Sequence, residues 1–99
     1  MILEIAQIDV KPGLEAEFEA QVAKAAPLFK RAKGCGGMAL HRSIEKPNRY
    51  RLMIDWATLE DHTVGFRGSQ DFAAWRELVG HCFESPPYVE HTAKVWQGF

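Results

Sequence analysis

The residues best suited to chemistry gather around a junction between a strand and a helix in the middle of the chain. Large apolar side chains alternate with Arg, Met and Asp over 50–56, and this period of two predicts a strand that ends at Trp56. Thr58 then offers a side-chain oxygen to the free amides of a new helix, with Asp61 placed to complete a capping box. His62, whose imidazole titrates near neutral pH, follows on that helix. The junction therefore predicts a pocket between an aromatic strand end and a histidine.

Each candidate has a chemical and a structural interpretation, and the sequence leaves both open. Trp56 lines a pocket for a flat aromatic molecule or belongs to the core, and His62 is a general acid or base or a surface residue. Arg42 shares the strand parity of apolar neighbours. Its guanidinium either enters an apolar region, where it needs a partner such as a substrate oxygen, or is solvated at the strand's end. His91, also on an apolar parity, is a pocket residue or a hydrogen-bonded core histidine.

The pattern of the whole chain predicts the order strand, helix, strand, strand, helix, strand, with the short junction helix before the last helix. Pro27 lies inside the first helical pattern and lacks an amide donor, so a kink or break is expected there. Gly34 and the glycines after it end that helix, and Ser69 is the expected N-cap of the last one. The expected strands are 2–10, 38–45, 49–56 and 88–96, and the expected helices are 14–33, 59–66 and 70–83.

This order is the βαββαβ arrangement of a ferredoxin-like α+β fold in one domain, 1–99. Right-handed crossovers give a four-stranded antiparallel sheet with the helices on one face. The first, third and last strands carry apolar residues on both faces, so the second face of the sheet needs a cover too. We expect that cover to be a second copy of the chain, in a homodimer that packs sheet to sheet and closes a dimeric α+β barrel.

Composition narrows the classes of partner. The 99 residues are 46% hydrophobic and 25% charged, with a formal net charge of −1. Because no cluster of Lys and Arg appears, a nucleic-acid surface is not expected, and no apolar run approaches the roughly 20 residues that span a bilayer. The N-terminus lacks the pattern of a signal peptide, so we expect a cytoplasmic protein in which Cys35 and Cys82 are free thiols. Only His81, beside Cys82, groups two metal-binding residues, and a zinc site is not expected.

Several short motifs, in order, extend over nearly the whole chain. They are Ile8-Asp9-Val10-Lys11-Pro12-Gly13, Glu17-Phe18, Gly34-Cys35-Gly36-Gly37, Asp55-Trp56, Ser69 with Phe72, and Pro87-Tyr88-Val89-Glu90-His91. Together they resemble the antibiotic biosynthesis monooxygenase family of the dimeric α+β barrel superfamily. The order and spacing are moderately specific for the fold and much less so for activity.

Departures from the family pattern qualify this resemblance. Relatives often carry a His three residues before the Ser or Thr that starts the last helix, where this chain has Phe66. His62 lies one turn earlier on the same face and is a candidate substitute. Haem-degrading relatives carry an Asn and an iron-ligating His at positions that correspond to Ala6 and Arg76. Because an arginine stays protonated and does not ligate iron, haem degradation is not expected.

The resemblance implies an oxygenase that uses no cofactor and acts on a small aromatic quinol or anthrone. His62 would accept a proton, and Arg42 or Arg76 would stabilise the substrate anion. The alternatives are a non-catalytic dimeric domain that binds a small molecule or serves in stress, and a haem-binding protein. The expected walls of the pocket are Trp56, Tyr50, Phe66, Phe72, Trp75 and His91.

Overall fold

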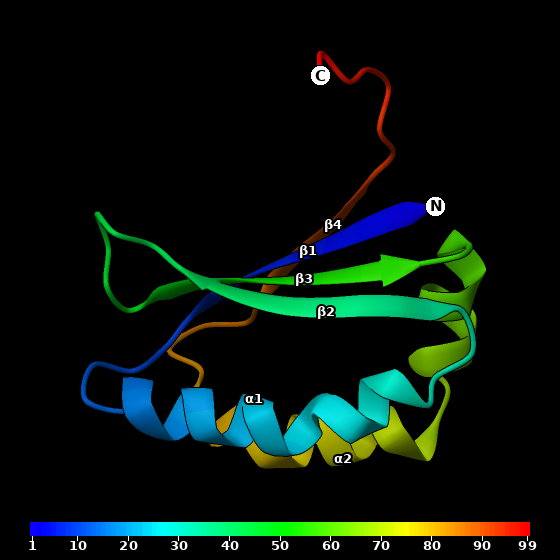
Figure 1. The fold of residues 1–99 in the computed structure, drawn as a ribbon. Coiled ribbons are helices and arrows are strands. Elements are labelled where there is room, and N and C mark those ends of the chain that lie inside the picture. Colours follow the sequence, from blue (N-terminus) through cyan, green and yellow to red (C-terminus); the bar gives the residue numbers. More distant parts are fainter.

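The computed structural model describes residues 1–99 as one four-stranded sheet with the helices gathered on one face (Figure 1). Neighbouring strands are antiparallel in the order β2-β3-β1-β4, so the expected ferredoxin-like α+β fold is confirmed. No helix is both long and apolar enough to cross a membrane. The elements are β1 (Ile2–Asp9), α1 (Glu15–Lys30), β2 (Cys35–Arg42), β3 (Arg49–Trp56), η1 (Asp61–Phe66), α2 (Gln70–Val79), η2 (Gly80–Cys82) and β4 (Tyr88–Thr92).

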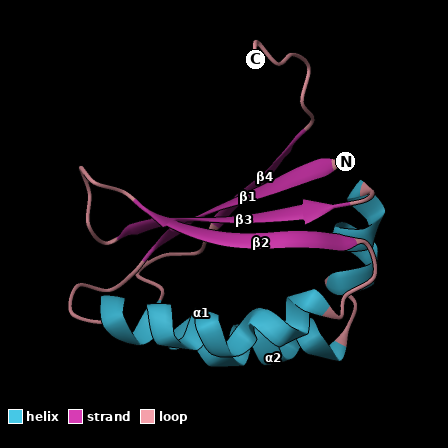
Figure 2. Cartoon of the chain, in the orientation of Figure 1, coloured by secondary structure: helices cyan, strands magenta, loops and turns pink.

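The core lies between the sheet and the two long helices, which form a second layer (Figure 2). Register places Ala6 opposite Leu52 and Ile8 opposite Tyr50, so alternate residues of β1 and β3 face the helices together. The predicted parity of both strands is therefore confirmed. The helix α1 contributes Phe18, Val22, Ala25 and Phe29, at steps of three and four residues.

The predicted caps form where the sequence places them. The Thr58 Oγ1 accepts a hydrogen bond from the Asp61 amide at 3.1 Å, and the Ser69 Oγ accepts one from the Phe72 amide at 3.2 Å. Gly34 adopts φ +81° after α1, and a side chain there would collide with the Asp61 carboxylate. Glycine is therefore required at the point where the chain turns from α1 into β2.

Several expectations about element boundaries are wrong. The second strand, expected over 38–45, is Cys35–Arg42. The helix α1 runs through Pro27 without a break, because proline costs one amide donor while buried residues on both sides hold the helix to the sheet. The last strand ends at Thr92, not at residue 96, because Thr92 pairs with Leu3 and β1 begins only one residue earlier. The last helix ends at Val79 and continues as the short 3₁₀ turn η2. The junction helix closes as a π-type turn.

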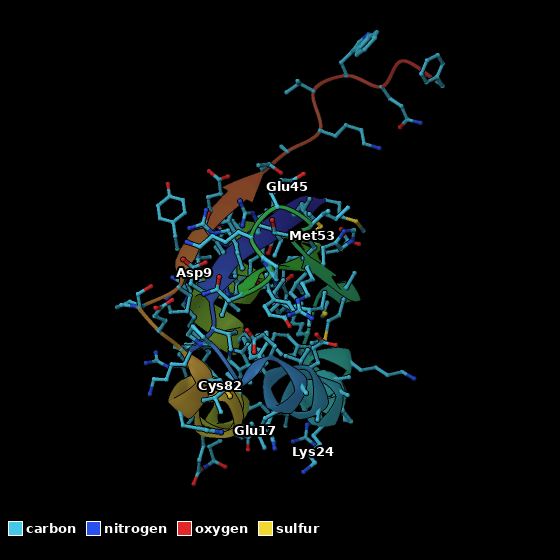
Figure 3. The ribbon with its side chains drawn as sticks, turned by 90° about the vertical axis from the view of Figure 1, so that its left-hand side faces the viewer. Asp9, Glu17, Lys24, Glu45, Met53 and Cys82 are labelled. Carbon is cyan, nitrogen blue, oxygen red and sulfur yellow. The ribbon has the colours of Figure 1, made fainter.

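The second face of the sheet carries no helix (Figure 1). Met53 lies on this face, between Ile5 of β1 and Ala39 of β2 in the paired register (Figure 3). The neighbouring Arg51 has a guanidinium nitrogen, Nη1, that is buried without a hydrogen-bond partner. Beyond β4 the chain projects away from the domain and exposes three large apolar side chains, Val95, Trp96 and Phe99.

Candidate active site

A cavity of about 230 Å³ lies between the helix-facing side of the sheet and the segment that runs from η1 through α2 to β4. Most of its wall is apolar, with the polar and charged side chains gathered among residues of β1, η1 and α2. Such a space suits one small, mainly apolar molecule held by a few polar contacts. The residues that line it are Glu4, Ala6, Ile8, Leu52, His62, Arg67, Phe72, Trp75, Arg76, Phe83, Pro87 and Val89.

Glu4 is the buried carboxylate of this cavity. The alternation of β1 places it on the face of Ala6 and Ile8, and only 5% of the residue is exposed. The Trp56 Nε1 donates a hydrogen bond to Glu4 Oε1 at 2.9 Å, and the second oxygen, Oε2, has no protein partner but is not sealed from the cavity. Burial raises the pKa of Glu4, against the lowering effects of the Trp56 hydrogen bond and the Arg67 charge. The site thus holds a carboxylate of raised basicity with one free oxygen.

His62 is held from three sides. Its ring stacks on Trp56 with centroids 5.2 Å apart and planes inclined by 15°. Its Nε2 lies 3.3 Å from Glu4 Oε1, and its Nδ1 lies 2.7 Å from His91 Nε2. Burial, followed by the nearby charges of Arg67 and His91, lowers the pKa of His62 to about 4. His62 is therefore a neutral imidazole near pH 7.

A hydrogen bond of 2.7 Å joins the two histidines, between His62 Nδ1 and His91 Nε2. Either nitrogen can donate, according to the tautomers of the two rings. Burial also lowers the pKa of His91, which lies beside Glu4 in the register of β1 and β4. Both histidines are then neutral near pH 7, and together they fix the position of the imidazole that lies against Glu4.

Two guanidinium groups complete the lining, and neither forms an ion pair with a protein carboxylate. The positive charge of Arg67 lowers the pKa of Glu4 and of both histidines. The Arg76 guanidinium lies over the Phe72 ring, 5.8 Å from its centroid. Both residues are exposed. They give the wall of the cavity a positive charge suited to an aromatic anion.

The structure brings some of the predicted site residues together and separates others. His62, Phe72, Trp75 and Arg76 line the cavity. Trp56 and His91 contact His62, and Phe66 packs between the Trp56 and Phe72 rings at 5.7 and 5.8 Å. These three residues support the cavity rather than line it.

Arg42 and Tyr50 lie outside the cavity lining, near the opposite end of β3. Arg42 is exposed at the end of β2, where its guanidinium donates to the Pro47 carbonyl and lies 3.6 Å from Glu19. Of the two interpretations of Arg42, the solvated one is found. Arg42 is therefore not placed to stabilise a substrate anion in the cavity. The Tyr50 hydroxyl donates to the Glu19 carboxylate at 2.6 Å, which makes Tyr50 a core residue and not a pocket wall.

Sequence reasoning overlooked Glu4 and Arg67. Glu4 could have been found from its parity, because it is the charged residue on the helix-facing side of an otherwise apolar strand. A carboxylate at such a position needs partners or a function. Arg67 lies in the turn after η1, and no periodicity in the sequence marks it.

Comparison with known proteins now assigns the family. The model of the antibiotic biosynthesis monooxygenase family matches residues 1–78. The chain belongs to the antibiotic biosynthesis monooxygenase family. The matched region includes Glu4, Trp56, His62, Arg67 and Arg76, so the polar lining of the cavity lies inside the family domain, while β4 lies beyond it.

Individual antibiotic biosynthesis monooxygenase relatives agree with this assignment. The chain is 44% identical over 96 residues to the uncharacterized protein YczJ of Bacillus subtilis (strain 168), in a match that covers 96% of this chain and 100% of that one. A homologue from Bordetella bronchiseptica, known from its crystal structure, is 61% identical, with a TM-score of 0.95 over 96% of this chain and 97% of its own. SnoaB, a cofactor-independent oxygenase from Streptomyces nogalater whose structure was solved as a mutant, is 18% identical, with a TM-score of 0.83 over 98% of this chain and 95% of its own. This last likeness shows the shared fold.

Proposed function

We propose that this family member is an oxygenase that acts without a cofactor on a small aromatic quinol or anthrone-type substrate. The observation that carries the proposal is the buried Glu4 carboxylate, whose free Oε2 opens into an apolar cavity beside the neutral His62. The fold shared with SnoaB adds support, because SnoaB is a cofactor-independent oxygenase.

The first step is removal of a proton from the substrate. Glu4 Oε2 accepts the proton of a quinol hydroxyl, and the raised pKa of Glu4 brings its basicity closer to that of the group it deprotonates. Trp56 and His62 hold the other oxygen in place during the transfer. In this scheme His62 lies against Glu4 and is fixed by its hydrogen bond to His91, so it positions the proton acceptor rather than taking the substrate proton itself.

The second step is the reaction of the substrate anion with oxygen. The electron-rich ring carbon gives electrons to O₂ and forms a C–O bond, the O–O bond breaks, and one oxygen atom leaves as water. A quinol and O₂ thus yield a hydroxyquinone and water, with the substrate as the sole reductant. Arg67 and Arg76 face the anion with positive charge, and the apolar wall excludes water from it.

The size of the cavity narrows the substrate class. An apolar protein cavity of about 150 Å³ holds a benzene molecule. The cavity of about 230 Å³ therefore suits a substrate with one or two rings better than a three-ring anthrone. A single-ring quinol with a short substituent is the substrate that we favour.

Replacing His62 with alanine is expected to lower quinol-dependent oxygen uptake by about tenfold or more, because the imidazole that positions Glu4 and its link to His91 are both lost. Oxygen consumption recorded over a panel of one- and two-ring quinols, with the non-enzymatic oxidation subtracted, measures the effect. Lys24→Ala, on the exposed side of α1 and away from both the cavity and the open sheet face, is the control and should retain full activity.

Unchanged uptake in the His62→Ala protein would remove this histidine from the mechanism. Binding of the quinols without oxygen consumption by the wild-type protein would favour the non-catalytic binding domain instead. The engagement of both His62 ring nitrogens by protein groups is the observation that suits that second function.

We further propose that two copies pack sheet to sheet. The open face carries Leu3, Ile5 and Met53 in adjacent strands, and the buried, unpartnered Nη1 of Arg51 lies in the same face. The exposed apolar side chains of the segment 93–99 lie beyond this sheet and add surface that a second copy can cover. An apolar face of this kind marks a protein interface.

The substitution Ile5→Glu is expected to convert the dimer into a monomer, because it places a second carboxylate beside Glu90 and against Met53 at the centre of the open face. Light scattering after size-exclusion chromatography gives the mass of the species. Ala23→Glu, on the exposed side of α1, adds the same charge elsewhere and should leave the mass unchanged. A wild-type protein that is monomeric at micromolar concentration would contradict this assembly.

A further inference from the structure

Three potential metal ligands meet away from the cavity, where the first turn of α1 packs against η2. Figure 3 shows two of them, Glu17 and Cys82, on these neighbouring elements. The His81 Nε2 lies 3.4 Å from Glu17 Oε2 and 3.5 Å from Cys82 Sγ. All three ligand atoms lie within 4.8 Å of one another. Glu17 and His81 come from different elements, so the cluster is made by the tertiary fold and not by sequence neighbours alone.

The two separations from His81 match those between ligands around one tetrahedral zinc ion. Zinc lies about 2.3 Å from a thiolate sulfur and about 2.0–2.2 Å from an imidazole nitrogen or a carboxylate oxygen. Tetrahedral angles then separate sulfur from nitrogen by about 3.6 Å and nitrogen from oxygen by about 3.4 Å. The observed separations of 3.5 and 3.4 Å are almost the same.

The donor set and the surroundings also favour zinc. Sulfur, nitrogen and oxygen donors in one site suit Zn²⁺, whereas Mg²⁺ and Ca²⁺ require oxygen ligands throughout. The Cys82 residue is fully buried, while the Glu17 and His81 side chains are about half exposed, so an ion can reach the site from solvent and meet the thiol beneath. Burial and the Glu17 charge raise the pKa of the Cys82 thiol, against the lowering effect of Lys11, so zinc would bind here by displacing the thiol proton.

We propose that Glu17, His81 and Cys82 form a zinc site with three protein ligands and a fourth position for water. The ion would join α1 to η2 and thereby fix the next residue, Phe83, which lines the cavity and pairs with Val10. Zinc bound here stabilises the folded chain, because the unfolded chain does not hold the three ligands together. This inference does not depend on the oxygenase proposal, since its test measures metal binding.

Cobalt tests the site directly, because a Cys-ligated tetrahedral Co²⁺ gives a sulfur-to-metal charge-transfer band and intense visible absorption. Chelator-treated protein titrated with Co²⁺ should show both features at one ion per chain, and Zn²⁺ should abolish them. Zinc alone should also raise the melting temperature. The exposed ligand is removed by His81→Gln and the buried one by Cys82→Ser, with circular dichroism used to confirm that each variant is folded.

Zinc affinity should fall at least about tenfold in His81→Gln, and the charge-transfer band should be absent from Cys82→Ser. The matched controls His41→Gln and Cys35→Ser change the same residue types elsewhere and should leave the affinity and the band intact. A wild-type protein that binds neither ion at one equivalent overturns the proposal. So does an unchanged zinc affinity in His81→Gln, whose side chain is exposed and whose fold is not at risk.

Discussion

Glutamine in place of Glu4 is expected to reduce quinol-dependent oxygen uptake by about a hundredfold or more, because the group that accepts the substrate proton becomes an amide. The amide oxygen can still accept the hydrogen bond from Trp56 that Glu4 Oε1 now accepts, and it can keep the contact with His62. The amide nitrogen then takes the place of Oε2 at the cavity. The substitution thus removes the base and leaves the geometry of the site in place.

The stability of the Glu4→Gln protein should rise or stay unchanged while its activity falls. The folded pKa of Glu4 lies above that of the unfolded chain, so at pH values above both the ionised carboxylate destabilises the folded protein. Glu4→Gln removes this cost, and the midpoint of urea unfolding near neutral pH should rise or stay unchanged. Loss of activity together with undiminished stability separates a catalytic carboxylate from a structural one.

The matched control is Glu77→Gln, which makes the same chemical change at an exposed position on α2. It should leave both oxygen uptake and urea midpoint at their wild-type values. Because Glu4 must be ionised to act, wild-type activity should also rise with pH across the raised pKa of this group. A Glu4→Gln protein with more than half of the wild-type activity would assign the proton transfer to another group.

The alternation of side chains along the strands predicts most of the sheet correctly, but the same alternation was used only in part to predict the residues of the site. The alternation in 50–56 correctly placed Tyr50 and Trp56 on the helix side, and the caps at Thr58 and Ser69 formed where their side chains allowed. Such signals are local, so they are readable from one chain. Glu4 obeys the same alternation but was not recognised, because its neighbours define the strand as apolar.

The remaining differences come from contacts between distant residues. The end of β4 is set by the length of β1, which no pattern within 88–96 records. Arg42 was predicted from parity alone, yet it lies at the end of the edge strand β2 and is solvated. The group of Glu17, His81 and Cys82 depends on the packing of α1 against η2, and the adjacent His81-Cys82 pair was its only sequence signal.

Acid should destabilise the protein through His62, and the substitution His62→Gln should remove much of that sensitivity. The folded pKa of His62, about 4, lies below the 6.5 of an unperturbed histidine. Between these values the unfolded chain binds the proton more readily, so stability present above about 6.5 is lost as the pH falls toward 4. From about pH 7 to about pH 4.5 the His62 contribution falls by about 2 kcal/mol. The side chain is only 4% exposed, so solvent screens this effect little.

Urea unfolding of the wild-type and His62→Gln proteins at both pH values tests this contribution. Glu4 affects stability with the opposite sign in this window and His91 with the same sign. Because both contact His62, their contributions change with the substitution, and the comparison reports the coupled group of three residues. The pKa values of Asp9 and Asp71 are lowered from 3.8, so these ion pairs are lost only at lower pH. His41→Gln, at an exposed site, should keep the wild-type acid sensitivity. An equal loss of stability in the wild-type and His62→Gln proteins would mean that His62 is solvated enough to accept a proton in the folded state, and the stacked, buried imidazole beside Glu4 would have to be abandoned.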